Sequence, residues 1–93
     1  MVEKCVVENC VCSNENDVIH RHHIIPTYLL GEQKRFVFIG SKEIVNSVFL
    51  CKKHHDMIHH MLEKKLFQWR LYSFEEIKKN YYNFTTWFLK NMR

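Results

Sequence analysis

All seven histidines of this 93-residue chain fall into two short clusters, at residues 20–23 and 54–60. Three cysteines precede the first cluster, and a fourth precedes the second at the start of a C-x2-H spacing. Thiolate and imidazole donors from two such segments can meet tetrahedrally on one zinc ion and tie the segments together. The residue types therefore predict a structural zinc site with the ligands Cys5, Cys10, Cys51 and His54, and with Cys12 as an alternative to Cys5 or Cys10.

Buried or free thiols are the competing interpretation of these cysteines. The C-x4-C spacing of Cys5 and Cys10 is weak evidence by itself, but the matching C-x2-H of Cys51 and His54 favours a metal site. Thiols inside a cell are mostly kept reduced, which also favours metal ligands over disulfides.

The remaining histidines offer donors for a second ion. His55 and His59 lie four residues apart on a predicted helix, so both rings project from one face and can bind the same ion. His22 and His23 are adjacent on a predicted strand and point to opposite sides of it, so one can be a ligand while the other has a different task. Hydrolysis of a phosphodiester is a reaction that could use both kinds of histidine. It needs a metal that neutralises charge on the phosphate and a base of near-neutral pKa that activates water.

Short strands and a helix must position these side chains. Residues 18–25 are β-branched and apolar around the first histidine cluster, which predicts a strand that Pro26 stops. Residues 36–39 and 48–50 are two further short β-prone segments. Over residues 52–67 the apolar side chains repeat at steps of three and four, which predicts a helix.

A second helix is predicted at the C-terminal end of the chain. Ser73, with Glu76 three positions later, forms a capping box that marks its start. Apolar and aromatic residues then recur at helical spacing, which favours a core-facing stripe over a platform for base stacking. The stripe consists of Phe74, Ile77, Tyr81, Phe84 and Phe88.

The length and composition fit one small domain with a thin apolar core, and chains of this size often add a structural metal. The formal net charge of +4 suits a polyanionic partner. The N-terminus has no secretory signal pattern, and no segment approaches the length of a membrane span. We therefore predict a single α+β domain over residues 1–93, cytoplasmic and without a membrane partner, with its core at 5–67 and a helical extension at 73–92.

The motifs together resemble the HNH endonuclease superfamily, whose members have a zinc-stabilised ββα-metal, or His-Me finger, domain. The family pattern has a zinc-knuckle cysteine pair, a strand that ends in H-H-I-x-P, and then N-x-V-x-L-C-x-x-[CH]-H-x-x-[IV]-H. This chain has the cysteine pair, HHIIP at residues 22–26 and NSVFLCKKHHDMIH at residues 46–59. The resemblance covers residues 5–60.

The resemblance implies a role for each matching residue. His22 becomes a ligand of a catalytic metal and His23 becomes the general base, while Asn46 braces the catalytic loop. His55 becomes the second ligand of that metal and His59 the third. The structural zinc set of the family corresponds to Cys5, Cys10, Cys51 and His54.

The predicted function is hydrolysis of phosphodiester bonds in DNA by a metal-dependent HNH endonuclease. Its cofactors would be one structural zinc ion and one divalent catalytic metal, for which an all-histidine site suits Mn, Ni, Co or Zn better than Mg. Two alternatives stay open: a non-catalytic zinc module that binds nucleic acid or protein on the same scaffold, and a protein with two structural zinc ions.

Basic residues beside the histidine clusters are the predicted contacts to DNA, namely Arg21, Lys52 and Lys53. Helix-borne lysines further along the chain can face DNA or simply keep two helices solvated, and these are Lys64, Lys65, Lys78 and Lys79. A chain this short offers little surface for a long recognition site, which favours a homodimer or a partner protein.

Overall fold

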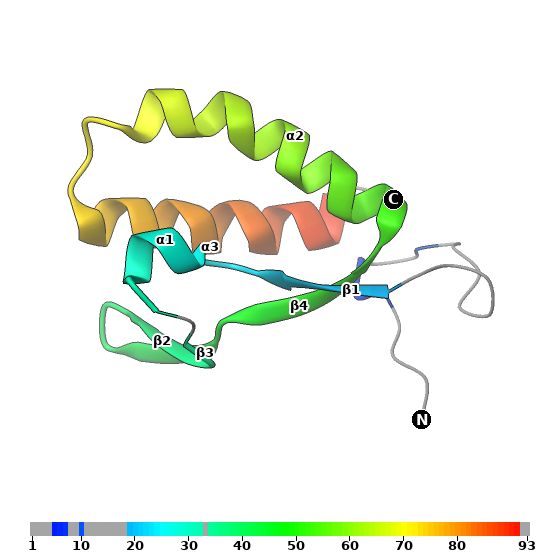
Figure 1. Cartoon of the computed structure of the whole chain (residues 1–93), viewed down its shortest axis with the longest axis horizontal. Helices are drawn as coiled ribbons and strands as arrows, with labels where there is room; N and C mark the ends of the chain where they lie inside the picture. Colours follow the sequence, from blue (N-terminus) through cyan, green and yellow to red (C-terminus); the bar gives the residue numbers. More distant parts are fainter. Residues whose placement is uncertain (1–4, 8–9, 11–18, 33, 92–93) are drawn as a thin grey trace.

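The computed structural model describes residues 5–7, 10, 19–32 and 34–91, and Figure 1 shows how their helices and strands are arranged. The elements in chain order are β1 (Ile19–His23), α1 (Thr27–Leu30), β2 (Phe36–Ile39), β3 (Lys42–Val45), β4 (Ser47–Cys51), α2 (Lys52–Trp69) and α3 (Phe74–Asn91). They form two small antiparallel sheets, β1–β4 and β2–β3, with the two long helices stacked over them. This arrangement confirms the predicted α+β class. None of the helices in the described ranges is both long and apolar enough to span a membrane.

The β1–β4 sheet joins the first histidine cluster to the start of α2. Its antiparallel register runs from Ile19 opposite Cys51 to His23 opposite Ser47. Residue 18, where the predicted strand begins, lies outside the described residues. Although the two strands are neighbours in space, a long connection that contains α1 and the β2–β3 hairpin separates them in the chain.

The alternation of side chains along β1 divides its residues between two faces. His20 and His22 lie on the face toward α2, where each ring contacts the ring of His55. Arg21 and His23 belong to the opposite face. The prediction that His22 and His23 point to different sides is therefore confirmed.

The first strand ends at His23, two residues earlier than predicted. The backbone N–H of Ile25 donates to the side-chain Oδ1 of Asn46 at 2.7 Å instead of to a neighbouring strand, and Pro26 follows. The short helix α1, which the sequence did not predict, then reverses the chain. It is closed by Gly31, whose φ of 76° lies in the left-handed region that favours glycine.

The β2–β3 hairpin turns at Gly40, whose φ is 62°. β2 has the predicted bounds, whereas β3 was not predicted because its sequence, KEIV, has little apolar alternation. The side chain of Lys78 is buried and donates to the carbonyl of Phe38 at 3.1 Å, and Lys42 donates to the hydroxyl of Tyr82 at 2.9 Å. These contacts hold the hairpin against α3, so neither of the two roles left open for Lys78, facing DNA or solvating a helix, applies to it.

β4 passes into α2 without a linker. Cys51 is both the last residue of the strand and the N-cap of the helix, with φ −69° and ψ 164°. His54 therefore lies in the first helical turn, and His55 and His59 lie one turn apart along the helix. The helix continues to Trp69, slightly beyond its predicted end.

α3 begins where the capping box predicted, because the N–H of Glu76 donates to Oγ of Ser73 at 3.2 Å. The predicted stripe does form core: Ile77 is half-buried against it, and three members are buried, namely Tyr81, Phe84 and Phe88. Phe74 is 44% exposed, so the expectation was wrong for this residue. It is the first residue of the helix and lies beyond the edge of the core.

Candidate metal centres

Four side chains from two distant segments converge as the sequence predicted. Cys5 and Cys10 come from the N-terminal segment, and Cys51 and His54 come from the junction of β4 and α2. Their donor atoms all lie within 4.8 Å of one another. The Sγ atoms of Cys5, Cys10 and Cys51 lie 3.5, 3.4 and 3.2 Å from Nδ1 of His54. Cys12, the alternative ligand, lies outside the described residues.

These distances fit a shared cation better than a set of hydrogen bonds. One ring nitrogen carries either one proton or one lone pair, so it cannot satisfy three thiols at once. A tetrahedral zinc ion with Zn–S of about 2.3 Å and Zn–N of about 2.0 Å would separate sulfur from nitrogen by about 3.5 Å. The pKa of Cys5 is raised to about 11, mainly by burial and also by the nearby Cys10 and Cys51 thiols, although backbone hydrogen bonds oppose the rise. The thiolate form therefore needs a nearby cation, and the four residues can hold a metal such as zinc.

The backbone brings the N-terminal segment to this position. The N–H of Val6 donates to the carbonyl of Phe49 in β4 at 2.9 Å, and the N–H of Cys10 donates to the carbonyl of Val7 at 3.1 Å. The side chain of Val7 is buried in the core. The N-terminal segment is therefore held beside β4 by a backbone hydrogen bond, by a tight turn and by the buried side chain of Val7.

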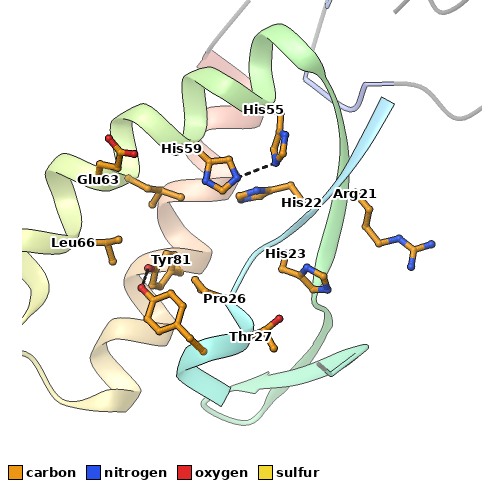
Figure 2. Close-up of a pocket in the computed structure, with 12 residues that line it drawn as sticks. Arg21, His22, His23, Pro26, Thr27, His55, His59, Glu63, Leu66 and Tyr81 are labelled. Atoms are coloured by element: carbon orange, nitrogen blue, oxygen red, sulfur yellow. Dashed lines mark hydrogen bonds between the residues drawn. The ribbon is translucent and has the colours of Figure 1, made fainter. Parts of the chain in front are cut away.

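A second group of donors lies on the other side of α2's first turns. The ligand atoms of His22, His55 and His59 lie within 4.8 Å of one another, and Figure 2 shows the three rings turned toward a common point. Nε2 of His55 is 2.9 Å from Nε2 of His59. Two imidazole nitrogens at right angles on an ion, each about 2.1 Å away, would be about 3.0 Å apart.

Burial keeps the central histidine of this group neutral. The side chain of His22 is buried, and its Nε2 atom has no hydrogen-bond partner among the described residues. The pKa of His22 is lowered to about 3, first by burial and then by positive charge on His59, His55 and His23. The pKa of His55 is also lowered, first by burial and then by His59 and His20, although Asp56 opposes the shift. A neutral imidazole with an unsatisfied buried nitrogen is a suitable metal ligand.

His20 is a member of the cluster that the sequence analysis missed. Its side chain is half-buried, and its ring stacks on that of His55 with centroids 4.9 Å apart. The available signal was its spacing of two from His22, which places both side chains on one face of a strand. His60, in contrast, is exposed.

A cavity of about 380 Å³ opens beside the three clustered histidines. Its lining includes Arg21, His23, Glu63 and Tyr81 as well as the clustered rings. Figure 2 shows the His23 ring on the opposite side of β1 from the His22 ring. The structure therefore brings the predicted base and the predicted ligands to the same cavity from the two faces of one strand.

Asn46 is buried and connects three parts of the chain. Its side chain accepts from the N–H of Ile25 at 2.7 Å and donates to the carbonyl of Ile25 at 3.0 Å. Its backbone N–H donates to the carbonyl of Arg35 at 2.8 Å, and its carbonyl accepts from Ile24 at 3.3 Å. Asn46 therefore holds the loop after His23 through both its backbone and its side chain.

The three cations predicted to contact DNA are exposed but do not lie together. Arg21 lines the cavity, and its guanidinium lies over the ring of Phe49 with the carbon 5.6 Å from the centroid. Lys52 and Lys53 lie in the first turn of α2 and do not line that cavity. Nζ of Lys52 is 2.7 Å from a carboxylate oxygen of Asp56, which neutralises part of its charge.

Comparison of the chain with protein-family models, with curated proteins and with solved structures finds no match. The interpretation of both histidine-containing sites therefore depends on their geometry and chemistry.

We predict that Cys51→Ala and His54→Ala each lose a tightly bound metal and several kcal/mol of stability, because metal binding contributes to the folding free energy of so small a scaffold. Metal stoichiometry and thermal melts measure both effects. His60→Ala is the matched control, since it removes an exposed imidazole from the same helix. Retention of the metal with a normal melt in both site variants would contradict the ligand set.

We also predict that Asn46→Ala lowers the free energy of unfolding by about 2–4 kcal/mol, because two buried backbone groups of Ile25 lose their partner. Urea denaturation measures this change. Asn83→Ala, on the exposed side of α3, is the control and should change stability by no more than about 0.5 kcal/mol. Equal stability of the two variants would show that Asn46 does not hold the loop.

Proposed function

We propose that this chain is a metal-dependent endonuclease of the HNH type that hydrolyses phosphodiester bonds in DNA. One observation carries the proposal: a buried, neutral His22 shares a donor cluster with His55 and His59, beside a cavity that His23 also lines. A structural metal site alone has no need for an open cavity next to its ligands, whereas a catalytic site does.

His22, His55 and His59 would hold the catalytic ion. When bound, a divalent ion supplies positive charge that stabilises the developing negative charge on a phosphate oxygen and on the leaving oxygen. Neutral nitrogen donors favour Mn, Ni, Co or Zn, with Mg as the less suited alternative. The Cys/His group, which consists of Cys5, Cys10, Cys51 and His54, would hold a separate structural zinc ion. Its four donors complete a tetrahedral site and leave no position for a substrate.

His23 would act as the general base. Its imidazole takes a proton from a water molecule while the water oxygen forms a bond to phosphorus and one bridging P–O bond breaks. Histidine is suited to this role because its ordinary pKa is close to neutral. His23 and His22 follow each other on β1, so the base and one ligand hold a constant separation on opposite faces of the strand.

Asn46 would keep this arrangement rigid. Its hydrogen bonds with Ile25 hold the chain immediately after His23, so the backbone that carries the base cannot shift without breaking them. Precise placement of a general base matters because proton transfer requires hydrogen-bond contact with the attacking water. Asn46 is therefore a positioning residue in the proposed reaction.

DNA is the proposed substrate because the site and the charge of the chain both suit a polyanion. The formal net charge is +4, and Arg21 lies in the lining of the cavity next to His23. A guanidinium can bind a phosphate through two parallel hydrogen bonds. A non-catalytic module on the same scaffold would bind DNA without cutting it, and activity measurements separate the two.

We expect His23→Ala to reduce cleavage by about 10²- to 10⁴-fold with little change in stability, since a general base contributes to the transition state rather than to binding. Conversion of supercoiled plasmid to nicked or linear forms measures the rate. His60→Ala should cut at the wild-type rate. Near-normal turnover in the His23→Ala variant would remove His23 from the mechanism.

We expect His55→Ala to abolish cleavage and to weaken binding of the second ion, yet to retain one tightly bound metal and a near-normal melt. The reason is that His55 belongs to the open site, whereas the closed Cys/His site is built from other side chains. Mild chelation of the wild-type protein should likewise stop cleavage before the protein unfolds. Loss of the tight metal in His55→Ala would assign His55 to the structural site instead.

A further inference from the structure

A second cavity of about 550 Å³ lies beside the β1–β4 sheet, and its lining is basic. Three cationic side chains contribute to it: Arg21 from β1, and Lys34 and Arg35 from the segment before β2. None of the described residues that line it is acidic. Lys34 also forms an exposed ion pair with Glu32, with 3.5 Å between nitrogen and oxygen. A concave surface with this charge suits phosphate groups.

Asn46 gives this basic cavity its shape. Its backbone N–H donates to the carbonyl of Arg35 at 2.8 Å, and its side-chain Nδ2 lies 3.5 Å from the carbonyl of Lys34. The two cations therefore belong to a segment that is held at a defined position against the start of β4, although both side chains are exposed.

An exposed face that carries two aromatic rings continues from this cavity onto the β2–β3 hairpin. Phe36, Phe38 and Val45 are 48%, 55% and 51% exposed. The register pairs Phe36 with Val45 and Phe38 with Glu43, so all four side chains lie on the same face of the hairpin. Val45 also lines the basic cavity. The guanidinium carbon of Arg35 lies 5.6 Å from the centroid of the Phe36 ring. The cations and the two rings thus form one continuous surface.

We propose that this surface binds a single-stranded segment of nucleic acid, with its phosphates in the basic cavity and its bases stacked on Phe36 and Phe38. Alternate residues of a strand are about 6.6 Å apart, close to twice the separation of about 3.4 Å between stacked bases. Base stacking on exposed aromatic rings beside a cationic groove is a general mode of single-strand binding. Bases in a duplex are already stacked on one another, so the rings select an unpaired segment.

The surface leads to the proposed catalytic centre. Arg21 and His23 line both cavities, so a strand held over Lys34 and Arg35 continues directly past His23. This part of the inference rests on the proposed nuclease function and names the form of its substrate. Binding itself needs neither the catalytic ion nor cleavage, and the two proposals can therefore fail separately.

The test is fluorescence anisotropy of labelled oligonucleotides with the full chain, without an added divalent ion. Three DNA probes of about twelve nucleotides are compared: a single strand, its duplex, and an abasic strand that keeps the phosphates but lacks bases. The single strand should bind most tightly. Phe38→Ala should weaken its binding about tenfold and leave binding of the abasic probe unchanged.

Arg35→Ala should weaken the binding of the ordinary single strand and of the abasic strand by a similar factor, because it removes a contact to phosphate. It should also reduce the slope of log K against log salt concentration by about 0.7. Arg35→Lys keeps the charge and should retain most of that slope. The matched controls are Phe67→Ala and Lys90→Ala, which remove an exposed ring from α2 and an exposed charge from the last turn of α3 and should bind as the wild type does.

An RNA strand of the same sequence, tested in parallel, shows whether DNA or RNA is bound more tightly. Binding of either one that depends on Phe38 supports the proposed single-strand surface. Tighter binding of the duplex than of the single strand, or unchanged affinity in both Phe38→Ala and Arg35→Ala, would overturn the proposal. So would sedimentation equilibrium that shows a dimer in the wild type and a monomer in Phe38→Ala, because the face would then be an interface between two copies.

Discussion

The hydrogen bonds of the buried Asn46 amide are the constraint on which the rest of the arrangement depends. The amide binds both backbone groups of Ile25, and the backbone of Asn46 binds Arg35. One residue therefore fixes the end of β1, the start of β4 and the approach to β2. A buried N–H, carbonyl or amide group that loses its hydrogen-bond partner costs free energy. Conformations of the loop after His23 that would break the bonds to Asn46 are therefore disfavoured.

The second organising feature is the use of both faces of β1. The face toward α2 carries His22, whose burial keeps it neutral and favours its use as a ligand. The other face carries His23 and Arg21, which also line the basic cavity. The alternation of a strand thus places metal-binding and substrate-facing groups within one residue of each other while it keeps their side chains apart. Asn46 stabilises the positions of these side chains because its hydrogen bonds hold Ile25, two residues after the end of β1.

α2 carries ligands of both candidate metal sites within its first eight residues. His54 lies toward the cysteines and the core, where its ring meets the edge of Phe88 with centroids 6.2 Å apart. His55 and His59 lie along another line of the same helix, toward His22. Since the helix is rigid, a metal at the Cys/His group would anchor the N-terminal segment and at the same time hold the second group in place. This coupling suits a domain whose apolar core is small.

The sequence by itself determined the features that depend on local spacing and residue type. These are the shared helix face of His55 and His59, the opposed directions of His22 and His23, the Ser73 cap, and the pairing of the N-terminal cysteines with the C-x2-H segment. Each follows from helix or strand periodicity or from the donor chemistry of the side chains. Only the tertiary structure decided which exposed residues stand next to the histidines. The stacking of His20 on His55 arises where β1 packs against α2, and the burial of Lys78 arises where the β2–β3 hairpin packs against α3. The basic and aromatic surface beside β1 arises where the segment before β2 is held against the start of β4. Strand periodicity places His20 on the same face as His22, but it does not show which helix that face packs against. The position of the segment before β2 depends on the long-range hydrogen bonds of Asn46, which no local spacing in the sequence indicates.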